Sequence, residues 1–521
     1  MNKLAVGIIV GCLLVLFGVP LFFQGESETR NSSLQKVIIV TPHNEQIRYE
    51  FGTAFDLWHA EHYGESVQVV WSVPGGTSEI RRMLQSQYQH AIETGAEPGG
   101  EADLVFGGGS YEHSVLKRPI EVEVNGELQS TTITVPIALS REYLDSTYGT
   151  TLIGDVRLYD SEGYWHGVAL SGFGIVYNND VLNSLNISSP DSWEALCNPA
   201  LFGSLALVNP AQSGSVTTAF EAILKNLGWI RGWQVLRRAA ANARYFSASS
   251  LKPPADVSQG DAAMGVCIDF YGRYQSQAIK EMGGGDRVGY IDPPGATIID
   301  PDPISLMRGA PNKKLAERFI KFCLSEEAQS LWQFSVLEDA EWEEETLVPL
   351  RGPIKFELRR MPVNKNLYSK YMDRMIDQVN PYAIAKPSPF PDRNMRPFIA
   401  PLFSGMAMDH HDDLIDAWHA IITHPSYPNT QKIVTSADVE DENLKALLAA
   451  FDAMPLFDGV DSEEDLSTAD GRAAIKNGWL KDGLRGRGLW HLEDQGSNAL
   501  RQISAKFFLN QYQYILELSG E

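Results

Sequence analysis

Short apolar runs alternate with stretches of helical periodicity through the first half of the chain. Residues 36–40 (KVIIV) predict a strand, and large apolar side chains then recur from Ile47 to Trp58 at the spacing of one helix face. A second strand is predicted at 67–73, and GGTSEIRRMLQSQY opens a second helix after it. Strands that alternate with helices in this way predict an α/β fold with a largely parallel sheet.

The junctions between these strands and helices share small or hydroxyl side chains. The best-defined junction follows a strand at 203–208, where a helix opens in the sequence SGS at 213–215. Similar junctions lie at 41–44, 75–78 and 107–110. Free backbone N–H groups and the helix dipole make such helix starts attractive to anions. Junctions of this kind together predict a polar cleft at the carboxyl ends of the strands.

Composition and charge narrow the class of protein. Of the 521 residues, 44% are apolar and 21% are charged, which is typical of a globular protein with a substantial core. The 66 acidic and 43 basic residues give a formal net charge of −23, so we expect no nucleic-acid partner. Four cysteines are too few for a disulfide scaffold, and Cys267 and Cys323 lie in apolar runs where we expect them to be buried.

The N-terminal segment predicts export. Residues 5–23 form one apolar run preceded by Lys3, and about 20 apolar residues suffice to span a bilayer. A basic start before an apolar run fits an export signal or an uncleaved anchor. No A-x-A cleavage pattern follows, which favours the anchor. We therefore expect a periplasmic or extracytoplasmic protein held at the inner membrane by this helix.

Several blocks of the sequence resemble a known family. They are LSGFGIVYNND at 170–180, SPDSWEALCNPALFGSLALVNPAQSGS at 189–215, QGDAAMGVCIDFYGRY at 259–274 and DPISLMRGAPNKKLAERFIKFCLSEEAQSLW at 302–332. In this order they resemble extracellular solute-binding proteins of ABC importers, in the ferric-iron-binding branch. The resemblance implies a receptor that captures a small polar solute and hands it to an ABC permease. It also leads us to expect a monomer without enzymatic activity.

The resemblance implies a two-lobe type II periplasmic-binding-protein fold with a hinge cleft. Residues 36–135 and 287–350 would form lobe 1, and 136–286 would form lobe 2. A mainly helical C-terminal extension at 351–521 and the N-terminal signal or anchor at 1–30 complete the predicted organisation. Binding would then shift the lobes from an open to a closed arrangement.

The resemblance also implies ligand residues. A ferric site in this family uses hard oxygen donors and a histidine, which map to His43, Glu79 and Tyr271 as metal ligands. The tandem tyrosines of the family fall at Phe270-Tyr271, and Phe270 cannot bind a metal, whereas Tyr274 lies three residues further on. The same aromatic residues could line a cleft without metal, and His43 could be a turn histidine bonded to backbone. No resident cofactor is expected, and a ferric ion would be the transported ligand.

A small anion or phosphonate-like compound is the other ligand that these residues would suit. Hydroxyl groups and backbone N–H groups at the helix starts would hold it. The hydroxyl-bearing candidates are Thr77, Ser78, Ser110, Ser213 and Ser215.

The C-terminal extension adds one cluster of chemical interest. The sequence DHHDDLIDAWH at 409–419 predicts a helix that Asp409 caps and whose acidic first turn complements the dipole; a metal site is the alternative. The acidic run at 338–345 and the segment 460–471 are predicted as solvated loops. Residues 498–518 predict an amphipathic helix that packs on the body.

Two other classes of function remain open at the level of sequence. An exported, membrane-anchored hydrolase is one, although the ALSGF around Ser171 lacks the glycine of a nucleophile elbow, and no HExxH or Walker motif is present. A sensory or scaffold protein built on a binding-protein fold is the other, with the extension as its partner surface.

Overall fold

The computed structural model describes residues 34–336, 352–455, 457–459, 462–464, 466–477 and 496–520. The predicted N-terminal segment 1–30 and the acidic run at 338–345 lie outside the described residues, and 460–471 is described only in part. None of the described helices is long and apolar enough to cross a membrane.

Lobe 1 is built on a mixed sheet. Strands β1, β2 and β3 run parallel, and β15 enters antiparallel between β3 and β9. In spatial order the strands are β2 (Val67–Ser72), β1 (Gln35–Val40), β3 (Leu104–Phe106), β15 (Asp300–Met307), β9 (His166–Ser171) and β16 (Met361–Pro362), with β6 (Thr134–Val135) also on β15. The helices of this lobe are α2 (Glu45–Tyr63), α3 (Thr77–Thr94), α4 (Ser110–Leu116), α5 (Arg141–Tyr148), α11 (Lys313–Leu324) and α12 (Glu326–Ser330). Short hairpins β4 (Ile120–Val124)–β5 (Glu127–Thr131) and β7 (Leu152–Ile153)–β8 (Val156–Arg157) lie outside the main sheet.

Lobe 2 repeats the same arrangement. Its strands β11, β12 and β13 are parallel, and β10 lies antiparallel between β13 and β14. In spatial order they are β12 (Ala243–Ser247), β11 (Leu205–Val208), β13 (Met264–Ile268), β10 (Phe173–Asn178) and β14 (Val288–Ile291). The helices are α6 (Asn179–Ser184), α7 (Gly214–Leu227), α8 (Trp229–Ala241), α9 (Lys252–Gln259) and α10 (Asp269–Ile279).

Two crossing segments join the lobes. Gly172 alone separates β9 of the first sheet from β10 of the second, and residues 292–299 lead back from β14 to β15. A Cβ at Gly172 would lie 2.7 Å from Asp292 Oδ1, so the two crossings approach each other as closely as a glycine allows. Two matching α/β lobes joined by crossing strands confirm the predicted two-lobe type II periplasmic-binding-protein fold.

The lobe boundary differs from the predicted one. Residues 136–171 were assigned to lobe 2, but β9 pairs with β15, and Tyr148 and Leu158 belong to the core of lobe 1. At the predicted boundary, residues 134–135 form a short strand that pairs within the first sheet. The chain crosses later, at Gly172.

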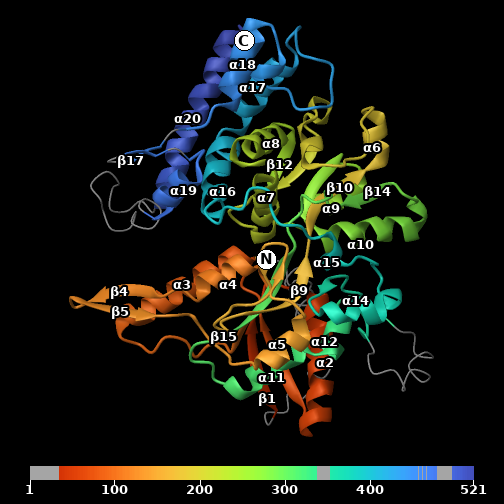
Figure 1. The fold of residues 1–521 in the computed structure, drawn as a ribbon, viewed down its shortest axis with the longest axis vertical. Coiled ribbons are helices and arrows are strands. Elements are labelled where there is room, and N and C mark those ends of the chain that lie inside the picture. Colours follow the sequence, from red (N-terminus) through yellow and green to blue (C-terminus); the bar gives the residue numbers. More distant parts are fainter. Residues whose placement is uncertain are drawn as a thin grey trace, which may run out of the picture.

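The extension is mainly helical, as predicted, and it divides between the lobes. Residues 352–385 lie on lobe 1, where β16 pairs with β9 and α14 packs on α5. From α16 onwards the chain packs on lobe 2, with α16 on α7 and α17 on α8 (Figure 1). The segment 386–395 is therefore a third connection between the lobes. The helices are α14 (Lys365–Tyr371), α15 (Pro381–Ile384), α16 (Arg396–Phe403), α17 (His411–Ile422), α18 (Glu442–Asp452), α19 (Ala469–Ile475) and α20 (Gly496–Ser519), with β17 (Phe457–Gly459) pairing β18 (Ser462–Glu464).

Details of the extension test two further predictions. Helix α20 buries Phe508, Tyr512 and Ile515 in the core of lobe 2, which confirms the predicted amphipathic helix. The capping role predicted for Asp409 is wrong. Helix α17 begins at His411 without a side-chain cap, and Asp409 instead accepts a 2.8 Å hydrogen bond from Arg501 Nε of α20.

The cysteines behave as small apolar residues. Cys197, Cys267 and Cys323 are free thiols, and each is buried. This confirms the burial predicted for Cys267 and Cys323.

Candidate ligand-binding cleft

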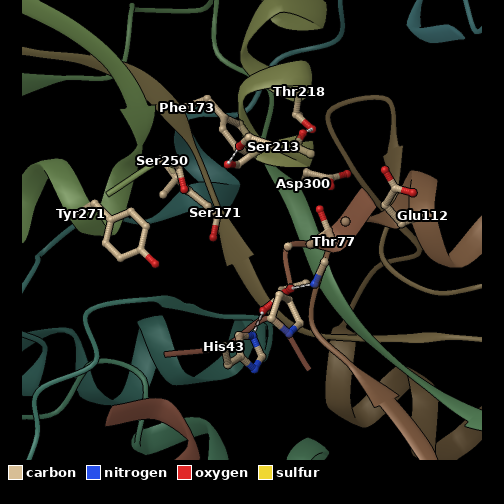
Figure 2. Close-up of a pocket in the computed structure, with 18 of the residues that line it drawn as sticks. His43, Thr77, Glu112, Ser171, Phe173, Ser213, Thr218, Ser250, Tyr271 and Asp300 are labelled. Carbon is tan, nitrogen blue, oxygen red and sulfur yellow. Dashed lines mark hydrogen bonds and ion pairs between the residues drawn. The ribbon is translucent and has the colours of Figure 1, made fainter. Parts of the chain in front are cut away.

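A cavity of about 360 Å³ lies between the lobes, beside the hinge. Lobe 1, lobe 2 and the extension all contribute side chains to it. Figure 2 shows lining residues of lobe 1, such as His43 and Thr77, facing lining residues of lobe 2, such as Ser213 and Tyr271. The predicted strand–helix junctions meet here, because the carboxyl ends of β1, β2, β3 and β11 all face the cavity. The junction residues that line it are Pro42, His43, Asn44, Gly75, Gly76, Thr77, Gly108, Gly109, Gln212, Ser213, Gly214 and Ser215. The polar cleft predicted at the strand ends is therefore present.

The local sequence explains why helices begin at these junctions. Asn44 accepts a hydrogen bond from Ile47 N at 3.0 Å and so begins α2 directly above the cleft. Glu79 accepts from Gly76 N at 2.9 Å and fixes the turn that leads into α3. Ser213 accepts from Val216 N at 3.4 Å at the start of α7. Each helix start is held by a side chain of its own first turn.

Some of the predicted site residues line the cavity. They are His43, Thr77, Ser213, Ser215 and Tyr271. The others are not among its lining residues. Glu79 is occupied in the turn before α3, and Tyr274 is half exposed in a neighbouring pocket.

The two remaining serines are turned towards carboxylates of the cleft wall. Ser110 Oγ donates to Asp300 Oδ1 at 2.6 Å, and Ser78 Oγ lies 3.5 Å from Glu112 Oε1. Both carboxylate residues line the cavity. The serines therefore support the wall, because their hydroxyls are already used.

His43 sits in a buried polar cluster at the floor of the cleft. Its Nε2 lies 2.7 Å from Asp302 Oδ2 and 3.1 Å from Arg360 Nη1. Asp302 Oδ1 also accepts from Gly108 N at 2.7 Å. Burial, aided by the Arg360 cation, holds the pKa of His43 well below its usual range, so the imidazole is neutral at pH 7. Its Nδ1 is buried without a hydrogen-bond partner among the described residues.

Arg360 and Arg396 of the extension line the cleft, and neither was predicted as a site residue. Arg360 stands immediately before β16, and Arg396 is the first residue of α16. Both side chains are 7% exposed. An isolated arginine in a segment outside the family resemblance carries no spacing or motif that could have marked it.

Of the predicted ferric ligands, His43 and Tyr271 line the cavity, and Glu79 is not among its lining residues. Among the described residues, no group of three or more His, Cys, Asp or Glu could hold a metal ion. His43 is bound to Asp302, and Glu79 is bound to Gly76 N. Burial raises the pKa of the Tyr271 phenol against the opposing effect of Arg360, which disfavours a phenolate in the ligand-free cleft.

Asp269, at the start of α10 beside the cleft, predicts a pH dependence of stability. Burial raises its pKa from 3.8 to about 7; Arg273 opposes the rise, and Asp292 adds to it. The pKa of Asp269 is higher in the folded state than in the unfolded state. Its contribution to the free energy of unfolding is therefore fully present below about pH 4 and is lost as pH rises through about 7. We expect the free energy of unfolding of the wild type, relative to Asp269→Asn, to fall between about pH 4 and 7 in urea titrations and to level off above that range. A constant difference across that range would contradict the assignment.

Comparisons with known proteins agree with the resemblance seen in the sequence. Residues 142–340 match the family model for bacterial extracellular solute-binding proteins, which confirms that resemblance for this part of the chain. The description of that family is of extracellular binding proteins and names no enzymatic activity.

The phosphoglycerate transport regulatory protein PgtC of Salmonella typhimurium is 23% identical over 228 residues, which is 42% of this chain and 54% of that protein. The chain thus spans about half the length of the curated relatives it matches. Among solved structures, the periplasmic binding protein AfuA from Actinobacillus pleuropneumoniae, with fructose-6-phosphate bound, is 15% identical and covers 74% of this chain and 97% of its own, with a TM-score of 0.45. The ferric binding protein from Campylobacter jejuni is 17% identical, covers 73% and 99%, and has a TM-score of 0.46.

Proposed function

We propose that this protein is the solute-binding component of an ABC-type importer and that its cleft captures a small organic anion of the phosphate-ester or phosphonate class. The observation that carries the proposal is the convergence of helix starts from both lobes on one cavity. The N-terminal ends of α2, α3 and α7 bring backbone N–H groups and positive dipole ends to it. The family match at 142–340 supports solute binding, and the phosphoglycerate in the name of PgtC supports this class of solute.

The carboxylates in the cleft wall do not prevent an anion from binding, because groups of lobe 1 already neutralise them or donate hydrogen bonds to them. Glu112 is paired with Arg81 at 2.5 Å. Asp300 accepts from both the N–H and the hydroxyl of Ser110. Asp302 is shared between the polar cluster and Gly108 N. Among the described residues, the buried side-chain atoms of the cavity lining that lack a hydrogen-bond partner are Nδ1 of His43, Oγ of Ser171 and Nε of Arg360.

Capture would couple solute binding to the position of the lobes. Across the cleft edge, a Cβ on Gly214 of lobe 2 would lie 2.4 Å from Thr77 Oγ1 of lobe 1. Arg82 Nη1 also donates to Ala211 O at 3.4 Å between the lobes. A solute that touches the junctions of both lobes stabilises this closed contact, and a permease would recognise the closed form. In this proposal the protein works in the periplasm, anchored by residues 1–30, as a monomer.

Thermal melting of the full chain against a solute panel tests the class of ligand. We expect 3-phosphoglycerate, fructose 6-phosphate or a phosphonate to raise the melting temperature, since a ligand at 100 times its Kd adds about 2.7 kcal/mol to the free energy of unfolding. Spermidine should give no rise.

Ferric citrate, compared with citrate alone, separates the anion proposal from iron capture. A rise with ferric citrate only, together with a visible tyrosinate-to-iron absorption band that Tyr271→Phe removes, would overturn the anion proposal in favour of iron. A flat response to every organic anion in the panel would also overturn it.

A further inference from the structure

The extension brings one arginine to the place where the lobes meet. Strand β16 pairs antiparallel with β9, with Met361 opposite Leu170. Arg360 therefore lies at the end of β16 that adjoins Ser171, the last residue of β9 before the hinge glycine. Arg360 and Ser171 both line the cavity.

The charge of Arg360 is only partly matched by the protein. Its Nη1 is ion-paired with Asp302 and contacts His43, while its Nε is buried and has no hydrogen-bond partner in the part of the chain that the structure describes. Burial lowers the pKa of Arg360 to about 10, so it remains a cation at pH 7. His43 is neutral, so it does not offset the positive charge of Arg360. One carboxylate thus serves a guanidinium whose planar fork of five N–H donors is only partly used.

Arg360 also reaches across to lobe 2. Its guanidinium carbon lies 4.6 Å from the ring centroid of Phe270, which stands beside Tyr271 in α10. The ion pair with Asp302 belongs to β15 of lobe 1. A group bound to this guanidinium is therefore held by contacts to both lobes at once.

Arg396, the second arginine that lines the cleft, differs from Arg360 because its donors are used within the protein. Arg396 Nη1 donates to Thr218 Oγ1 at 2.8 Å and to Glu221 Oε2 at 3.0 Å, and its Nη2 donates to Gly214 O at 3.2 Å. Its guanidinium also stacks on Tyr111 at 4.6 Å. Because these donors are committed to α7, Arg396 is a positioning residue that fixes the start of that helix.

We propose that Arg360, supplied by the C-terminal extension, is the residue that pairs with the phosphoryl or carboxylate group of the bound solute, so that the extension is part of the binding site. The inference rests on the proposed capture of an anion and adds the residue that selects it. A guanidinium fork matches two oxygens of one phosphoryl or carboxylate group, and the unused Nε–H is available for such a pair. The extension then has a role in recognition beyond its packing.

Isothermal titration of the full chain with 3-phosphoglycerate and with fructose 6-phosphate tests the assignment. We expect Arg360→Gln to weaken Kd for the better of these two probes at least tenfold, because a charge-assisted pair is lost. The matched control is Arg472→Gln. Arg472 forms a buried pair with Asp392 at 2.6 Å, with side chains 5% and 8% exposed, and it does not line the cavity. The control should lower the melting temperature and leave Kd unchanged.

The outcomes separate the two proposals. If the wild type binds a probe and Arg360→Gln binds it equally well, the role of Arg360 is overturned while anion capture stands. If the wild type binds neither probe and the solute panel shows no other organic anion, both fail. Should Arg360→Gln not fold, Arg360→Lys keeps the positive charge opposite Asp302 but lacks the fork. It should still bind about tenfold more weakly, and wild-type affinity in that variant would overturn the assignment.

Discussion

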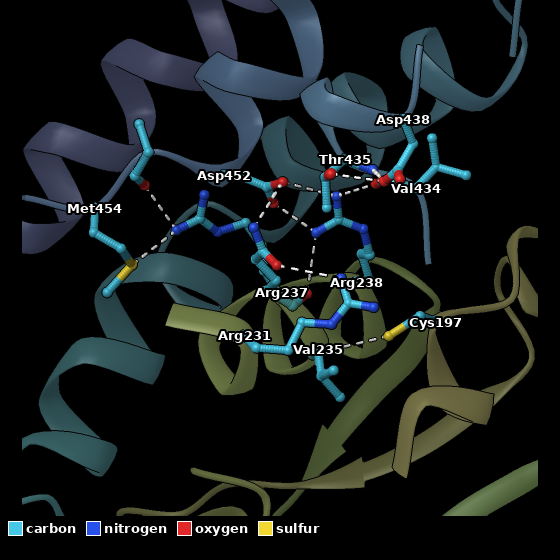
Figure 3. Close-up of polar contacts among 12 residues, drawn as sticks. Cys197, Arg231, Val235, Arg237, Arg238, Val434, Thr435, Asp438, Asp452 and Met454 are labelled. Atoms are coloured by element: carbon cyan, nitrogen blue, oxygen red, sulfur yellow. Dashed lines mark hydrogen bonds and ion pairs between the residues drawn. The ribbon is translucent and has the colours of Figure 1, made fainter. Parts of the chain in front are cut away.

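Replacing Asp452 by alanine is expected to lower the free energy of unfolding by about 3–5 kcal/mol, because it leaves buried arginines without a carboxylate. Asp452 ends α18 and accepts from Arg238 Nη1 at 2.6 Å and from Nη2 at 3.1 Å (Figure 3). The Arg238 side chain is fully buried. Its neighbour Arg237 is also buried, lies over the ring of Phe508 at 4.7 Å, and has an unpartnered Nε and Nη1. The contacts that are lost belong to the interface that joins the extension to lobe 2.

Urea unfolding followed by tryptophan fluorescence measures this effect. The control is Asp409→Ala, which removes another ion pair of the extension, to Arg501, whose side chain is 46% exposed. An exposed pair contributes about 0–1 kcal/mol, so the control should change little. Equal losses in Asp452→Ala and in Asp409→Ala would show that the buried pair does not hold the extension.

Replacing Glu50 by alanine should cost about 3 kcal/mol or more through the other attachment of the extension, the one on lobe 1. Glu50 is fully buried in α2. Its carboxylate accepts from Ile354 N and Lys355 N at 2.7 Å and from Phe356 N at 2.8 Å. Removing it leaves these N–H groups without an acceptor, and each costs about 1–3 kcal/mol when buried. The extension would then lose its attachment to lobe 1 at residues 354–356.

Hydrogen exchange locates that loss. In Glu50→Ala we expect the amides of 354–356 to lose protection before the rest of lobe 1, and urea titration gives the free energy. Glu61→Ala, at an exposed position of the same helix, should stay within about 0.5 kcal/mol of the wild type. Unchanged protection at 354–356 in Glu50→Ala would contradict the role assigned to this carboxylate.

The parts of the fold that local chemistry determines could be predicted from the sequence. Ile47, Phe51 and Phe55 recur at helical spacing, and all of them are buried on one face of α2. The junctions with small and hydroxyl residues could be recognised because glycine and serine favour helix starts wherever they occur. Their convergence followed from the α/β pattern, since parallel strands end at one edge of a sheet.

The parts of the fold that depend on long-range pairing could not be predicted from the sequence. The crossing at Gly172 is set by which sheet β9 joins, and that pairing links residues 166–171 to β15, far along the chain. Arg360 reaches the cleft only because β16 adds to the same sheet. Asp409 has the local pattern of a helix cap, but a distant partner, Arg501, takes its carboxylate. Tertiary contacts override local preference at such positions.

The third connection between the lobes also has a consequence for how the protein acquires its structure. Lobe 1 is assembled from chain on both sides of lobe 2, and the core of lobe 2 includes Phe508, Tyr512 and Ile515 of α20. The core of lobe 2 cannot be completed until the ribosome has added Ile515, whereas the last buried residue in the core of lobe 1 is Val363. Contacts so distant along the chain slow folding. Lobe 2 should therefore stay incompletely folded until residue 515 has been synthesised, while the core of lobe 1 can form earlier.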